Sequence, residues 1–146
     1  MTFSFIVPGE PVAWKRVGRD PKFGHSYIHK SVRQAMKDVA NSYRAAGGKM
    51  LEGPIRLHCA FYLGGRCRSV ELDPRDLSNM IKLVEDALEG HAYKNDRRIV
   101  AYSPIPFKAM DKANPRTVIL VDNYQDDDAV HQQAHLDFRR NVLGES

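Results

Sequence analysis

The chain has 146 residues, of which 42% are hydrophobic and 27% are charged, and it carries a formal net charge of +4. This length predicts one domain, and this composition is that of a globular protein, which argues against global disorder. The sequence contains no apolar run of about 18 residues and no signal-peptide pattern, so we expect no membrane association and a cytoplasmic location.

The N-terminal part is predicted to contain a strand, a basic segment and a helix. Residues 2–8 are rich in Phe, Ile and Val, which favours a strand. Residues 12–29 form a basic segment with a weak strand pattern near Tyr27. Residues 31–46 have helical periodicity, with Ser31 as the expected N-cap and two glycines after the last turn.

Positive charge is concentrated in this N-terminal part. Residues 1–50 carry nine Lys or Arg and three acidic residues, whereas residues 122–146 carry six acidic residues and two arginines. A basic face attracts the phosphate backbone of a nucleic acid without regard to its sequence. Charge alone leaves this interpretation and a solvated surface with scattered lysines equally open.

The middle of the chain has clear periodicity. Residues 55–63 alternate between apolar and other side chains, which predicts a half-buried strand with one apolar face. After a polar loop, a helix is expected to begin near Pro74 to Asp76 and to run to about Glu89. Its apolar face consists of Leu77, Met80, Ile81, Val84 and Leu88. Because this face turns toward the core, the polar residues at positions 78, 79, 82 and 86 are expected at its rim.

The C-terminal part is predicted to add two strands and a tail. Residues 98–107 favour a strand with an irregular end, because two prolines occur there. Residues 117–121 favour a short apolar strand. An acidic stretch then precedes residues 129–143, which form either a weak helix or a partly ordered tail. We therefore expect one domain over residues 1–124 and an acidic tail over residues 125–146.

The most informative feature is a polar cluster at the start of the second helix. It comprises Asp73, Asp76, Ser78, Asn79 and Lys82, followed by Asp86 and Asp96. Like charges held close together repel, whereas a hard divalent cation prefers oxygen ligands of this kind. A metal-binding acidic cluster in a basic chain suggests a nuclease.

Simpler interpretations exist for the same residues. Asp76 is a good N-cap for the helix, and Lys82 and Asp86 have the spacing of a surface ion pair.

Asp96 follows a short loop, and a neighbouring strand would bring it to the N-terminal end of the helix.

Residues 73–99 resemble the RusA-type Holliday junction resolvases, a family common in bacteria and prophages. The family's Asp-x-Asp-Asn-x-x-Lys pattern corresponds to residues 76–82, and its Asp-Ala-Leu and glycine correspond to Asp86-Ala87-Leu88 and Gly90. Its Asp-Asp pair before an isoleucine corresponds to Asn95-Asp96. The family's opening Pro-Gly-x-Pro and basic loop are similar to Val7-Pro8-Gly9-Glu10-Pro11 followed by Lys15-Arg16.

The resemblance implies a fold, an activity and partners. Family members are small α+β proteins, with a mixed β-sheet packed with two main helices. They act as homodimers that cut four-way DNA junctions by paired nicking in recombination and repair, using Mg2+, for which Mn2+ is an alternative. By position, Asp76 and Asp96 match metal-binding carboxylates and Lys82 matches the catalytic lysine. Asp86 matches a further acidic position, which we also assign to the metal.

One position departs from the family pattern. Ser78 stands where the family has its second aspartate, and a hydroxyl is a weaker ligand for Mg2+ than a carboxylate. Mg2+ commonly uses one or two carboxylates together with water and phosphates, and Asp73 or Asp86 is a candidate replacement. Two functions therefore stay open: an active resolvase, and a catalytically impaired protein that binds DNA junctions.

The mechanism expected from the resemblance is metal-assisted hydrolysis of a phosphodiester. Ions held by Asp76, Asp96 and Asp86 would activate water and neutralise charge on the phosphate. Lys82 would stabilise the developing negative charge, and Asn79 would orient a ligand. Basic side chains near the N-terminus would follow the DNA backbone without reading its sequence. These residues are Lys15, Arg16, Arg19, Lys22 and Lys30.

Two aromatic residues lie within this basic segment. For Trp14 we favour packing against the sheet over stacking on an unpaired base at a junction. For Phe23 both interpretations stay open.

Overall fold

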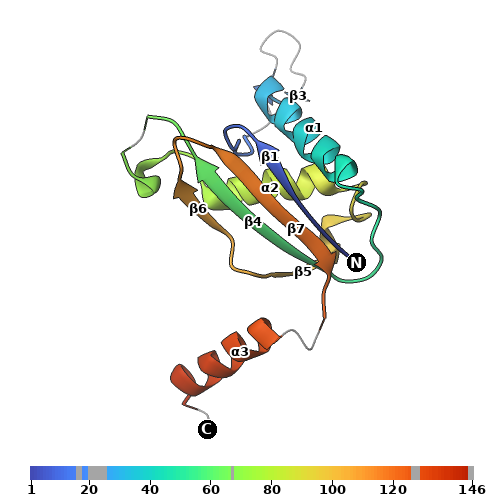
Figure 1. Ribbon diagram of the computed structural model, residues 1–146, viewed down its shortest axis with the longest axis vertical. Helices are drawn as coiled ribbons and strands as arrows, with labels where there is room; N and C mark the ends of the chain where they lie inside the picture. The colour runs from blue at the N-terminus through green and yellow to red at the C-terminus, as the bar shows by residue number, and fades with distance from the viewer. Residues whose placement is uncertain (16–17, 20–25, 67, 126–128, 145–146) are drawn as a thin grey trace.

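A mixed sheet organises the chain, for which the computed structural model describes residues 1–15, 18–19, 26–66, 68–125 and 129–144 (Figure 1). Its strands are β1 (Thr2–Pro8), β4 (Ile55–Leu63), β5 (Ile99–Tyr102), β6 (Phe107–Met110) and β7 (Arg116–Asn123). β7 lies between β1 and β4 and is antiparallel to both. β5 and β6 are parallel to β4 and follow each other along its other edge. A separate ribbon pairs β2 (Gly18–Arg19) with β3 (Ser26–Tyr27).

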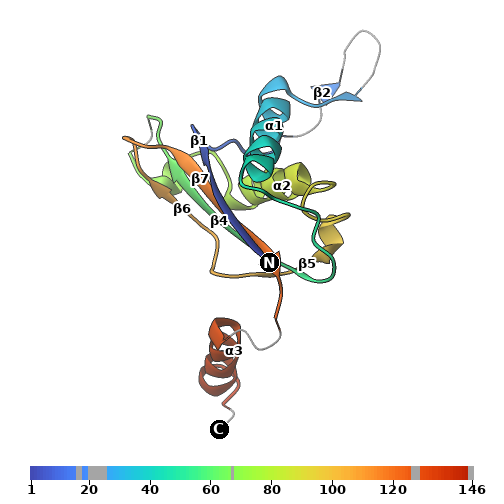
Figure 2. The same cartoon turned by 45° about the vertical axis from the view of Figure 1, so that its right-hand side comes forward.

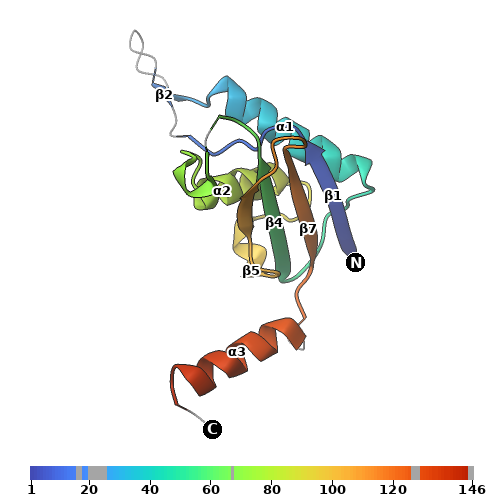
Figure 3. The same cartoon turned by 60° about the vertical axis from the view of Figure 1, so that its left-hand side comes forward.

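Helices α1 (Lys30–Ala45) and α2 (Leu77–Leu88) lie on the same face of the sheet (Figure 2). The short 3-10 helices η1 (Val70–Leu72) and η2 (Asp96–Arg98) precede and follow α2. A further helix, α3 (Ala129–Asn141), comes after β7 and lies apart from the sheet (Figure 3). The expected α+β class, with two main helices on a mixed sheet, is confirmed. The acidic residues 126–128 lie outside the described residues.

The alternation in residues 55–63 is confirmed by β4. Its five odd-numbered side chains are at most 1% exposed. They are Ile55, Leu57, Cys59, Phe61 and Leu63. In β7, Ile119 pairs with Cys59 on one side and with Phe5 of β1 on the other. Because side chains alternate along a strand, this row faces the helices and forms the centre of the core.

The start of α1 differs from the prediction. His29 occupies the N-cap position, and within the described residues no side chain caps the helix. Ser31 therefore lies inside the first turn, because the chain turns into the helix two residues earlier than its sequence suggested. The predicted end is confirmed, since Gly47 follows the helix with φ +82°, a left-handed conformation that glycine adopts at little cost.

The buried face of α2 is rotated from the predicted one. Leu77 and Ile81 are only half-buried. The buried residues are Met80, Leu83, Val84, Ala87 and Leu88. Because α2 packs against α1 as well as against the sheet, the buried face of the helix extends further to one side than the apolar face predicted from the sequence. Ser78 and Lys82 are nevertheless exposed, and Asn79 and Asp86 are half-buried, so the predicted rim is confirmed.

The strand predicted over residues 98–107 is two strands in the structure. β5 pairs with the beginning of β4 and β6 with its end, and the prolines at 104 and 106 lie between them. A proline lacks the N–H donor of a ladder, so a continuous strand cannot pass through both positions. The strand predicted over residues 117–121 is confirmed and extends to Arg116–Asn123. Each helix in the described part of the chain is too short or too polar to cross a membrane.

Candidate active site

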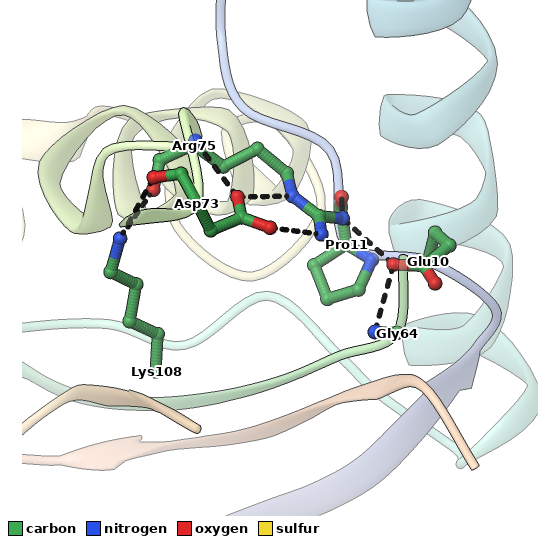
Figure 4. A network of polar contacts seen from close by, with 6 residues as sticks. All are labelled: Glu10, Pro11, Gly64, Asp73, Arg75 and Lys108. Atoms are coloured by element: carbon green, nitrogen blue, oxygen red, sulfur yellow. Dashed lines mark hydrogen bonds and ion pairs between the residues drawn. The ribbon is translucent and has the colours of Figure 1, made fainter. Parts of the chain in front are cut away.

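A buried arginine–carboxylate pair holds the turn that leads into α2 (Figure 4). The side chain of Asp73 is only 3% exposed. Its Oδ1 accepts hydrogen bonds from the Arg75 backbone N and Nε, both at 2.9 Å, and its Oδ2 accepts one from Nη2 at 2.8 Å. These bonds from Arg75 lower the pKa of Asp73 to about 2. Both oxygens of Asp73 are therefore engaged in holding the turn.

Arg75 also reaches the ends of the strands. Its Nη1 donates to Glu10 Oε2 at 2.8 Å and to the Pro11 carbonyl at 2.9 Å. Glu10 Oε2 in turn accepts from the Gly64 backbone N at 3.1 Å, and a Cβ at Gly64 would collide with Glu10. On the other side, Lys108 Nζ donates to the Arg75 carbonyl at 2.9 Å. These hydrogen bonds thus connect the turn before α2 to the segments after β1 and β4 and to β6. The network fixes the position of Asp76 at the end of this turn.

Asp76 stands at the N-cap position of α2 and is exposed. Its side chain does not cap the helix within the described residues, so the simple capping role is not observed. Its Oδ2 accepts a hydrogen bond from Asn79 Nδ2 at 3.3 Å. A surface cavity opens beside it, lined among others by Trp14, Lys15 and Arg66. An exposed carboxylate therefore shares a cavity with three cationic residues, Lys15, Arg66 and Arg75.

Lys82 lies on the exposed rim of α2 and has two partners. Its Nζ lies 3.5 Å from Asp86 Oδ2, which confirms the predicted ion pair, and 5.1 Å from the centroid of the Trp14 ring. The Trp14 backbone N donates to the Asn79 carbonyl at 2.9 Å. Trp14 was expected to pack against the sheet, and its half-buried ring does border the core, but its polar contacts are with α2. The loop after β1 therefore holds an aromatic face against Lys82.

Asp96 lies toward the other end of α2. It begins η2, and its backbone N donates to Glu89 Oε1 at 3.2 Å, where Glu89 is the residue after the helix. The expectation that Asp96 reaches the N-terminal end of α2 therefore does not hold. The chain reverses after Gly90 and returns beside the C-terminal half of α2, where the Tyr93 hydroxyl donates to the Glu85 carbonyl at 2.7 Å.

Glu85 is an acidic residue on this rim that the sequence pattern did not single out. It is half-buried and accepts a short hydrogen bond from the Tyr102 hydroxyl. Burial raises its pKa, and the charges of Asp96 and Asp86 raise it further. Its position three residues after Lys82 on the same rim was the signal that could have identified it.

A family model described as Endodeoxyribonuclease RusA matches residues 8–122 of the chain. The chain belongs to the RusA family. This confirms the family suggested by the motif around α2, and RusA membership implies a function in resolving Holliday junctions. No curated protein sequence gives a match to the chain. The RusA match ends within β7, so α3 lies beyond it.

The carboxylates expected to bind metal do not form one cage. Among the residues that the structure describes, no three His, Cys, Asp or Glu side chains are arranged to hold a metal ion. Asp76 stands at the N-cap position of α2, Asp96 lies beside Glu89 just after the helix, and Asp86 pairs with Lys82. Asp73 was a candidate to replace the missing carboxylate at position 78, but both of its oxygens are bound by Arg75. The oxygen donors still suit Mg2+, which commonly uses one or two carboxylates and completes its shell with water and phosphate.

The basic residues predicted to bind DNA are only partly within the described ranges. Lys15 and Lys30 are exposed, and Lys15 borders the cavity beside Asp76. The backbone of Arg19 lies in β2. Arg16 and Lys22 lie outside the described residues, as does Phe23. Arg66, which lines the same cavity as Lys15, was not predicted, because its polar loop has no pattern that distinguishes it from a solvated loop.

Proposed function

We propose that this RusA-family chain is an Mg2+-dependent endodeoxyribonuclease that resolves four-way DNA junctions by paired nicking, acting in recombination and repair in the cytoplasm. The observation that supports this most is the position of Asp76. Its carboxylate is exposed at the end of a turn that Arg75 and Asp73 hold rigidly, in a cavity that also contains Lys15 and Arg66. Such a cavity offers a cation ligand beside side chains that attract phosphate.

The residues of the rim take separate roles in this proposal. Asp76 is a metal ligand beside the cavity, and Asn79, at 3.3 Å, orients its carboxylate. Asp96 and Asp86 supply carboxylates for a cation at the other end of the rim. When bound, Mg2+ or Mn2+ lowers the pKa of a water molecule and offsets phosphate charge. Lys82 stabilises the oxygen that becomes negative as the phosphodiester is cut, because its ammonium group is a compact charge on the same rim.

Paired nicking requires two such sites, and we propose that they come from a homodimer. The sheet face opposite the helices carries an apolar row that the register aligns. It consists of Ile6, Val118, Ala60 and Phe107. Ile6 is 56% exposed and Phe107 is 39% exposed. Apolar side chains on an uncovered sheet face are the kind of surface that a second copy buries.

The direct test uses a labelled four-way junction and a linear duplex of the same sequence, each with and without Mg2+. We expect symmetric nicks in two strands of the junction, only when Mg2+ or Mn2+ is present, and little cutting of the duplex. Single, unpaired nicks from a monomer would contradict the dimer. Equal binding to junction and duplex would contradict the proposed function altogether.

A second candidate function is supported by Ser78. Its exposed side chain occupies the position of a family aspartate, and Asp73 cannot compensate while Arg75 binds it. A protein that binds junctions at any Mg2+ or Mn2+ concentration without cutting them would fit this candidate. If the wild type cuts junctions, Ser78→Asp should raise the cleavage rate on the order of tenfold, because it adds a stronger ligand on the rim; if the wild type only binds them, Ser78→Asp should restore cleavage. Ser78→Asn, which adds no charge, is the matched control and should not raise the rate.

Trp14 provides a prediction about Lys82. Trp14→Leu removes the aromatic face at 5.1 Å from the ammonium group. Since a cation–π contact at an exposed site contributes about 0.5–1 kcal/mol, we expect the single-turnover cleavage rate to fall about two- to fivefold. Trp14→Phe should retain part of the rate. In a Lys82→Met background, Trp14→Leu should have no further effect, and an equal loss in both backgrounds would show that Trp14 does not act through Lys82.

A further inference from the structure

Helix α1 carries a line of cationic side chains, of which only Lys30 was expected from the sequence to contact DNA. We call Lys30, Arg33, Lys37 and Arg44 the basic stripe. Their spacings of 3, 4 and 7 residues place them on one side of a helix with 3.6 residues per turn. All four are exposed. Asn41 lies on the same line and accepts a hydrogen bond from Arg44 Nη2 at 2.6 Å.

No ion pair among the described residues neutralises the charge of this stripe, since no carboxylate there forms one with any of the four side chains. The one acidic residue of α1, Asp38, accepts a hydrogen bond from Gln34 at 3.0 Å, on a different side of the helix. The stripe therefore presents cations to solvent along the whole length of α1.

The stripe also borders a groove that reaches Asp86 of the candidate active site. Arg33, Lys37 and Arg44 line one wall of a surface groove between α1 and α2, and Asp86 lines the opposite wall. Asp86 is the residue that pairs with Lys82 on the rim. The residues from Lys30 to Arg44 span about 21 Å at 1.5 Å per residue, which is the length of about six base pairs.

We propose that the basic stripe binds the sugar–phosphate backbone of one duplex arm of the DNA, alongside the candidate active site. This inference rests on the proposed function and adds the surface that would hold the arm. A straight row of exposed cations next to a groove suits a linear polyanion, and the acidic wall at Asp86 keeps the backbone on the side of α1. Contacts of this kind position DNA without reading its sequence, so the stripe should bind arms of any sequence.

The first experiment measures binding of a fluorescent four-way junction at several salt concentrations. The test variant carries Arg33→Gln, Lys37→Gln and Arg44→Gln, since glutamine is a good helix former and keeps α1 intact. We expect its Kd to rise tenfold or more near physiological salt. The slope of log K against log salt should become shallower by about 0.9 for each phosphate that the variant no longer neutralises, and by about 2.7 for three such phosphates. The control carries Lys112→Gln, Arg139→Gln and Arg140→Gln, which remove the same charge elsewhere, and its Kd should change less than about twofold.

A second experiment shortens the junction arms in steps of two base pairs. Wild-type affinity should fall once an arm no longer reaches along the stripe, and the affinity of the test variant should depend much less on arm length. Thermal unfolding of both triple variants should match the wild type. If wild type binds and cuts junctions while the test variant binds them equally tightly with the same salt slope, the stripe proposal fails and the proposed function stands. Binding to anionic lipid vesicles is measured in parallel. If the test variant loses binding to the vesicles but not to junctions, another polyanion occupies the stripe and the proposal is wrong.

Discussion

A chain carrying Asp76→Asn should bind a four-way junction about as tightly as the wild type and cut it at least about a thousandfold more slowly. The asparagine keeps the size of the side chain but removes the charge that binds a cation, and metal assistance contributes several kcal/mol to phosphodiester hydrolysis. Folding should be unaffected, because Asp76 is exposed and the hydrogen bond that it accepts from Asn79 is long at 3.3 Å. The measurement is single-turnover cleavage at saturating protein, with the Kd for the junction determined in Ca2+ or without metal.

Asp38→Asn is the control for this variant. It removes the same charge from an exposed side chain of α1 whose hydrogen bond is to Gln34. Cleavage by Asp38→Asn should remain within about twofold of wild type. Loss of junction binding by Asp76→Asn would assign Asp76 to DNA binding rather than to catalysis, and wild-type cleavage by this variant would remove Asp76 from the mechanism.

The second large effect is expected from Arg75→Met, which should lower the free energy of unfolding by about 3 kcal/mol. The variant leaves the Asp73 carboxylate buried, at 3% exposure, without its cation, and breaking a buried ion pair from one side costs about 3–5 kcal/mol. We place the effect at the lower end because Arg75 itself is 21% exposed. Urea unfolding followed by circular dichroism measures it. Lys82→Met, which breaks the more exposed pair with Asp86, should cost less than about 1 kcal/mol, and an equal cost in both variants would contradict this account.

The same pair predicts a pH dependence of stability. Arg75 lowers the pKa of Asp73 from its ordinary 3.8 to about 2 in the folded state. The ionised carboxylate therefore stabilises the fold above about pH 4, and this contribution is lost as the pH falls from about 4 to 2. The loss should be about 2 kcal/mol. In Arg75→Met the pKa of Asp73 is no longer depressed, so this part of the acid destabilisation should disappear. If the free energy of unfolding of Arg75→Met falls as much as that of the wild type between pH 4 and 2, other carboxylates cause the decline.

Breaking this pair should also affect the site. Arg75 connects the turn before α2 to Glu10 and Pro11, and Lys108 holds the Arg75 carbonyl from β6. The fold and the position of Asp76 therefore depend on the same contacts. A variant that unfolds only partly should already lose cleavage, because a carboxylate displaced by about 1 Å no longer meets the geometry that catalysis requires.

Local patterns in the sequence were enough to locate β4, the extent of α2 and the polar rim of α2. These predictions succeeded because alternation and helical periodicity act between residues a few positions apart, and burial of one face follows directly from them. The motif from Asp76 to Lys82 lies within one such element. Its residues therefore share a rim in the structure as the spacing required, and the match to the RusA family over residues 8–122 agrees with it.

Other features depended on contacts between distant parts of the chain. Arg75 meets Glu10 across 65 residues, and the ring of Trp14 meets Lys82. Asp96 lies beside Glu89 because the chain reverses after Gly90. The basic stripe borders the groove that contains Asp86 because α1 packs against α2. The sequence by itself determined which residues carry the chemistry and which face of each element is apolar. Only the tertiary structure decided which carboxylate is committed to the fold, Asp73, and which is exposed in a cavity, Asp76, because burial and ion pairing arise from the packing of separate elements.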